Sequence, residues 1–130
     1  MFKKFGKIII TVDDYDEALD FYVNKLGFVK VTDKQLAPGM RWVSVAPSAS
    51  NETVVVFEKA TTREDKERLG KQFATMTLDL VTDDMDKTYQ ELSAKGVEFV
   101  EKPTNAPWGR QAVIKDLYGN VFDLIEESPN

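Results

Sequence analysis

The strongest constraint on the fold is an internal repeat that relates the two halves of this 130-residue chain. The motif Asp83-Asp-Met-Asp follows the motif Asp13-Asp-Tyr-Asp by 70 residues. Arg110 follows Arg41 by 69 residues, and each arginine begins a segment rich in β-formers. Similarity at one fixed offset indicates that a structural unit is built twice. The sequence therefore predicts two modules of the same topology.

Each half reads as a strand, a helix and three further strands. Asp14 provides an N-cap for the first helix, and Gly27 and Gly96 have the position of a C′ residue after each helix. The second half ends with a loop over 103–109 and a hairpin turn at Gly119 and Asn120, two residues that tolerate positive φ. The expected strands are 7–12, 28–31, 41–46 and 53–58, then 75–81, 97–100, 110–114 and 121–125.

These elements predict an α+β fold, in which two β-α-β-β-β modules form an eight-stranded curled mixed sheet around a cavity. The modules span 1–59 and 73–130, and together they make a single domain. The charged segment 60–72 is expected to be a solvated linker that contains at most a helical turn. Each module alone would have a marginal core at roughly 60 residues, so the two are expected to pack together.

Charge and composition narrow the classes of function. The net charge is −5 with acids and bases interspersed, which argues against nucleic acid or an anionic membrane as a partner. The basic N-terminus lacks the apolar region of a signal peptide, and no apolar run approaches a membrane span. A cytoplasmic location is expected. The chain has no Cys and no His, so any metal would have to be held by carboxylates and neutral oxygens.

One carboxylate stands out in the last strand. Asp123 lies in the apolar run Val121 to Ile125, where an acid is costly unless it faces water, a partner or a ligand. Thr75, Thr77 and Asp79 place oxygen atoms on one face of another strand. That pattern fits either hydrogen bonds to a ligand or a hydrated outer face.

With these motifs in order, the chain resembles the vicinal oxygen chelate superfamily, the glyoxalase, bleomycin-resistance protein and extradiol dioxygenase group. The resemblance covers essentially the whole chain. It implies paired β-α-β-β-β modules, a sheet curled around a pocket and, commonly, a homodimer. The motifs that carry it are Ile9-Ile-Thr-Val-Asp-Asp, Ala18-Leu-Asp-Phe-Tyr, Leu26-Gly-Phe, Asp83-Asp-Met-Asp, Leu92-Ser-Ala-Lys-Gly-Val, Pro107-Trp-Gly-Arg and Asp116-Leu-Tyr-Gly-Asn-Val-Phe-Asp-Leu.

Metal-dependent members of that superfamily place ligands on the first and last strand of each module. The resemblance assigns these positions to Lys7, Val55 or a neighbour, Thr77 and Asp123. A cation and an apolar side chain are not ligands, and one carboxylate with one hydroxyl is too few for a tight divalent site. We therefore expect no catalytic residues, no bound metal and no cofactor.

Six residues are expected to bind a ligand: Lys7, Arg41, Thr77, Trp108, Arg110 and Asp123. Lys7 and Asp123 either form an ion pair in place of the metal, or bind opposite ends of a ligand, or meet solvent. Arg110 is a candidate anion clamp, whereas Arg41 is more simply a surface residue. Trp108 is a candidate pocket lid or dimer contact, and Trp42 a core anchor.

The first function predicted is metal-free binding of a polar or aromatic small molecule, as in drug or metabolite sequestration. The alternative is a divalent-metal-dependent lyase, isomerase or dioxygenase that works around Asp123. A third is a structural or regulatory dimer whose cavity has collapsed.

Overall fold

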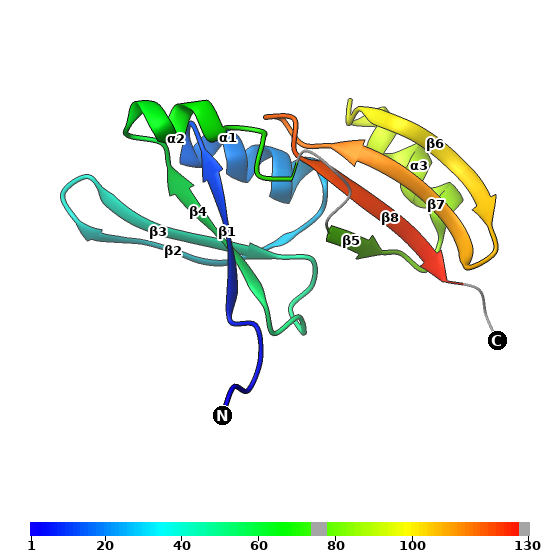
Figure 1. Ribbon diagram of the computed structural model, residues 1–130, viewed down its shortest axis with the longest axis horizontal. Helices are drawn as coiled ribbons and strands as arrows, with labels where there is room; N and C mark the ends of the chain where they lie inside the picture. Colours follow the sequence, from blue (N-terminus) through cyan, green and yellow to red (C-terminus); the bar gives the residue numbers. More distant parts are fainter. Residues whose placement is uncertain (74–77, 128–130) are drawn as a thin grey trace. The chain divides into compact units, whose positions relative to one another are not determined.

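The computed structural model describes residues 1–73 and 78–127, and the chain divides into two compact units, Met1–Leu69 and Gly70–Asn130 (Figure 1). They are called the first unit and the second unit. Each contains a mixed sheet of four strands and a helix that packs on it.

The first unit has the predicted β-α-β-β-β order. Its sheet runs β1-β4-β3-β2, with β1 and β4 parallel and the other pairs antiparallel. The first helix begins after Asp14, whose side chain accepts a hydrogen bond from the Glu17 backbone N–H at 2.9 Å. The elements are β1 (Lys7–Val12), α1 (Tyr15–Leu19), its π-helical continuation η1 (Asp20–Lys25), β2 (Val29–Ala37), β3 (Met40–Ala46), β4 (Val54–Lys59) and α2 (Arg63–Arg68).

The second unit repeats this topology. Its sheet order is β5-β8-β7-β6, again with the first pair parallel and the others antiparallel. Asp84 caps the helix by accepting from the Lys87 backbone N–H, as Asp14 does in the first unit. The predicted duplication of an α+β module is therefore confirmed. The elements are β5 (Leu78–Val81), α3 (Met85–Ala94), β6 (Phe99–Ala106), β7 (Gly109–Lys115) and β8 (Val121–Glu127).

In each unit the helix packs on one face of the sheet and creates a small apolar core there. The Tyr22 ring of η1 lies 5.4 Å from the Phe57 ring of β4, and the Tyr89 ring of α3 lies 4.8 Å from the Phe99 ring of β6. Because side chains alternate along a strand, the residues between the core positions point to the opposite face. This opposite face of the second unit carries the candidate site. The predicted joining of the two sheets into one of eight strands stays a prediction.

Two loops are shorter than expected. β2 extends to Ala37 and pairs with β3 as a long hairpin, and β6 extends to Ala106. Pro103 is accommodated because β6 is an edge strand, where a missing N–H need not break a ladder. The predicted loop over 103–109 is thus reduced to a turn of Pro107 and Trp108.

The segment before β5 packs against the turn that precedes β8. Gly70 has φ +74°, and a Cβ on it would lie 1.7 Å from the Tyr118 carbonyl oxygen. The Val121 backbone N–H donates to the Phe73 carbonyl at 2.7 Å. The predicted helical turn in the linker is α2, which begins at a capping box formed by Thr62 and its N3 residue.

The turn itself differs from the expectation for Asn120. Only glycines have positive φ among the described residues, so Gly119 (φ 104°) makes the turn and Asn120 does not share it. Asn120 is instead fully buried. Its side-chain amide donates to the Asp116 carboxylate at 2.9 Å, and its side-chain oxygen accepts from the Phe73 backbone N–H at 3.4 Å.

Candidate functional site

A cavity of about 720 Å³ lies on the helix-free face of the sheet in the second unit. A volume in this range fits a drug-sized ligand. Its walls combine apolar and acidic side chains, and in the described part of the chain none of the lining residues is basic. The lining residues are Asp79, Val81, Trp108, Gln111, Asp123, Ile125 and Glu127.

Two of these carboxyl groups, those of Asp79 and Asp123, are neighbours on the parallel strands β5 and β8. The two residues are register partners, so their side chains leave the sheet side by side. Asp123 Oδ1 is buried and has no hydrogen-bond partner among the described residues. Burial, a hydrogen bond with Asp79 and the negative charges of Asp79 and Glu101 raise the pKa of Asp123 to about 6. Asp123 therefore holds its proton more tightly than a free carboxylate does.

The first unit provides an internal comparison for this pair. In the first unit, β1 and β4 form the parallel pair that β5 and β8 form in the second unit. The register partners Ile9 and Val56 of the first unit occupy the position of Asp79 and Asp123. The same topology is thus built with an apolar pair. It follows that the fold does not require carboxylates at this position.

Trp108 forms one end of the cavity and is 59% exposed. Its indole N–H donates to Gln111 Oε1 at 3.0 Å, and Gln111 Nε2 donates to Glu101 Oε1 at 3.4 Å. The Thr104 hydroxyl donates to the same Glu101 oxygen at 3.2 Å. These contacts join the turn, β7 and β6 in one chain of hydrogen bonds.

The two predicted arginines, Arg41 and Arg110, contact aspartates at the starts of helices and do not line this cavity. Arg41 makes two hydrogen bonds to Asp33, at 2.8 and 2.9 Å, and one to Asp16 at 3.0 Å. These bonds raise the pKa of Arg41, and the Arg41 contact lowers the pKa of Asp33. Arg110 binds Asp86, the second residue of α3, as Arg41 binds the second residue of α1. The pair is a repeated structural contact, and the predicted clamping of an anion by either arginine stays a prediction.

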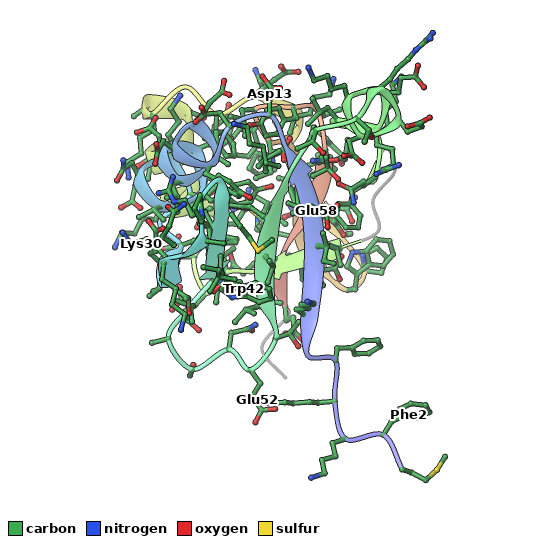
Figure 2. The ribbon with its side chains drawn as sticks, turned by 90° about the vertical axis from the view of Figure 1, so that its left-hand side faces the viewer. Phe2, Asp13, Lys30, Trp42, Glu52 and Glu58 are labelled. Carbon is green, nitrogen blue, oxygen red and sulfur yellow. The ribbon has the colours of Figure 1, made fainter. Side chains whose placement is uncertain are left out.

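Lys7 and Asp123 belong to different units, and each has neighbours within its own. Lys7 Nζ lies 4.8 Å from the centre of the Trp42 ring, a cation–π contact on β1 and β3. Figure 2 shows Trp42 on its strand in the first unit. Trp42 is half-buried, so it is less enclosed than the predicted core anchor. The predicted link between Lys7 and Asp123 stays a prediction, and Thr77 lies outside the described residues.

The side chains at the four ligand positions do not fit a divalent metal. Lys7 offers an ammonium group, and Val54, Val55 and Val56 are all apolar, so any neighbour of Val55 is equally unable to coordinate. Within residues 1–73 and 78–127, no group of three or more His, Cys, Asp or Glu is arranged to hold a metal ion. The donor set at these positions therefore gives no support to metal-assisted chemistry.

Sequence reasoning missed the polar residues Glu101, Gln111 and Glu127 of the site, and its apolar lining residues Val81 and Ile125. Glu101 and Gln111 lie outside the motifs, and only the register of β6 and β7 brings them to one face. Asp79 was recognised as a polar position, but its pairing with Asp123 was not predicted. The available signal was the repeat, because it aligns Asp79 with an isoleucine 70 residues earlier.

A family model for the Glyoxalase/Bleomycin resistance protein/Dioxygenase superfamily matches residues 4–124. The chain belongs to this superfamily. The resemblance noted from the sequence is thereby confirmed, and the paired modules are the fold that it implied.

Individual relatives are similar to this chain over nearly its whole length. An uncharacterized protein of Shewanella frigidimarina (strain NCIMB 400) is 40% identical over 121 residues, which cover 92% of this chain and 90% of the relative. The crystal structure of UcmS2 is 29% identical with a TM-score of 0.85, covering 98% of this chain and 100% of its own. That of TnmS3, an antibiotic binding protein from Streptomyces sp. CB03234, is 31% identical with a TM-score of 0.79 and covers 98% of each chain.

None of the helices in the described parts of this superfamily member has the length and apolar character needed to cross a membrane.

Proposed function

We propose that this superfamily member binds a small organic molecule without a metal, in the cavity of the second unit, and that the ligand carries a cationic or hydrogen-bond-donating group. The observation that carries the proposal is the Asp79–Asp123 pair at a register position where the first unit has Ile9 and Val56. Two adjacent carboxyl groups repel each other when ionised, so the pair costs stability that the apolar version would not.

The chemistry of the cavity wall defines the ligand class. Asp79, Asp123 and Glu127 are acceptors for a protonated amine, and none of the described lining side chains would compensate the charge of an anion. Trp108 offers an indole face for stacking, and Val81 and Ile125 add apolar surface. A flat apolar body with an amine at one end fits this combination.

The antibiotic-binding relative supports a role in sequestration. TnmS3 is described as an antibiotic binding protein, and its chain aligns with 98% of this one. A binder of this kind requires only shape, stacking and a few fixed polar groups, all of which the cavity supplies. Sequestration of a drug or metabolite is the role that we propose for this chain. The homodimer and the cytoplasmic location stay predictions.

The control variant for the test takes its two replacement residues from the first unit. The double variant Asp79→Ile/Asp123→Val copies the Ile9–Val56 pair into the second unit, so it is expected to fold. We expect flat amines such as 9-aminoacridine to raise the Tm of the parent protein and leave that of the double variant unchanged. Neutral analogues such as acridone should have a smaller effect on the parent.

The same protein is then equilibrated with nickel, zinc or iron, dialysed and analysed for metal. A stoichiometric metal that is lost in the double variant would overturn the metal-free proposal and favour a lyase, isomerase or dioxygenase. Equal Tm shifts with amines in the parent and double variant would place the ligand elsewhere.

A further inference from the structure

Trp108 occupies a position from which it can define the width of the cavity. It is one of only two residues between the paired Ala106 and Gly109, at the tip of the β6–β7 hairpin. The indole is largely exposed and reaches the cavity from this turn. Strand pairing does not constrain the indole there, so its orientation depends on its side-chain contacts.

The polar contact of the indole has a defined direction. An indole N–H is a donor only, so it can bond to the Gln111 amide only through Oε1. Gln111 Nε2 is then turned toward Glu101, whose carboxylate is an acceptor. A flipped amide would set two donors against each other at Trp108 and two acceptors against each other at Glu101. The amide is held in one orientation from both ends.

We propose that Gln111 is a positioning residue that sets the orientation of Trp108, with Glu101 locking the Gln111 amide, and that it thereby selects flat ligands. The inference rests on the proposed function for its ligand, but the orientation of the indole can be measured without any ligand. The Trp42→Phe background makes Trp108 the only tryptophan, since the chain has two.

Four changes are compared in that background by acrylamide quenching and steady-state anisotropy of Trp108 fluorescence. Gln111→Met removes both hydrogen bonds of the amide and keeps a side chain of nearly the same length. Glu101→Leu removes only the hydrogen bond between Gln111 and Glu101. Glu101→Gln keeps an acceptor oxygen for the Gln111 amide. Gln35→Met is the matched control, because Gln35 bonds within the first unit to the Ala37 carbonyl at 2.8 Å.

We expect Gln111→Met to raise the quenching constant about twofold and lower the anisotropy, because loss of one net hydrogen bond favours the detached indole ~5-fold. Glu101→Leu should change the quenching constant and the anisotropy in the same directions as Gln111→Met does. Glu101→Gln should keep both near the values of the Trp42→Phe protein, and Gln35→Met should leave them unchanged. Unchanged quenching and anisotropy in Gln111→Met would overturn the proposal, even if its Tm falls.

Binding provides the second readout. The affinity for 9-aminoacridine should fall ~5-fold in Gln111→Met, a larger loss than that for the non-aromatic diamine putrescine. An equal loss for both amines would refute the selection of flat ligands. If neither amine binds the parent, the proposed function fails, while the quenching data still decide whether Gln111 positions Trp108.

Discussion

Replacing Asp123 by Asn should stabilise the protein at neutral pH. The pKa of this carboxyl is raised from 3.8 to about 6, so the folded state holds the proton more tightly than the unfolded state. The stability that the protonated Asp123 carboxyl contributes is therefore lost as the pH rises from about 4 through 6, and the ionised carboxylate at pH 7 destabilises the folded state. An amide has the shape of the carboxyl group without its charge.

The size of the effect follows from the shift in pKa. A rise from 3.8 to about 6 corresponds to at most ~3 kcal/mol. Water in the cavity screens part of this interaction, so we expect Asp123→Asn to raise the free energy of unfolding by ~1–2 kcal/mol at pH 7. At pH 4 the carboxyl is protonated in the folded state, and the difference should be close to zero.

Urea unfolding followed by circular dichroism at pH 4, 5.5 and 7 measures this difference directly. Asp83→Asn is the matched control, because it removes an exposed carboxylate from the same unit and should change stability by less than ~0.5 kcal/mol. A variant that is less stable than the parent at pH 7, or a difference of the same size at pH 4 and 7, would refute the reasoning.

Three further changes test the fold around the site, each by urea unfolding. Arg41→Met should lower stability by ~1 kcal/mol, because a bidentate contact is lost, and should lower it more than Arg110→Met; equal effects would contradict this. Gly70→Ala should cost ~3 kcal/mol through positive φ and the clash with the Tyr118 carbonyl, whereas Gly96→Ala, with open space around it, should cost ~1 kcal/mol. Asn120→Ala should cost ~2 kcal/mol because it leaves buried polar atoms unpaired, and a neutral effect would show that Asn120 is dispensable.

The repeated topology could be predicted from the sequence because local signals report it. Helix caps at Asp14 and Asp84 and glycines at Gly27 and Gly96 act within a few residues of chain, so they can be recognised without a structure. The last strand and its isolated acid were also visible in this way. The lengths of the strands at the hairpins could not be predicted from local signals, because they depend on pairing between strands.

The site was only partly predictable for the same reason. Asp123 and Trp108 were found because an acid in an apolar strand and an aromatic residue in a turn are locally unusual. Glu101 and Gln111 are ordinary residues on strands, and their role depends on register across three strands. Arg41 of β3 and Arg110 of β7 suggested ligand contacts, but the structure pairs each with an aspartate in the first turn of a helix.

The most direct test of the central claim is calorimetric titration of the Trp42→Phe protein with 9-aminoacridine, with and without EDTA. We predict saturable binding at one site per chain that EDTA does not change, that quenches Trp108 and that is lost in Asp79→Ile/Asp123→Val. Binding that requires an added divalent metal, or binding that the double variant retains, would contradict a metal-free site built on this carboxyl pair.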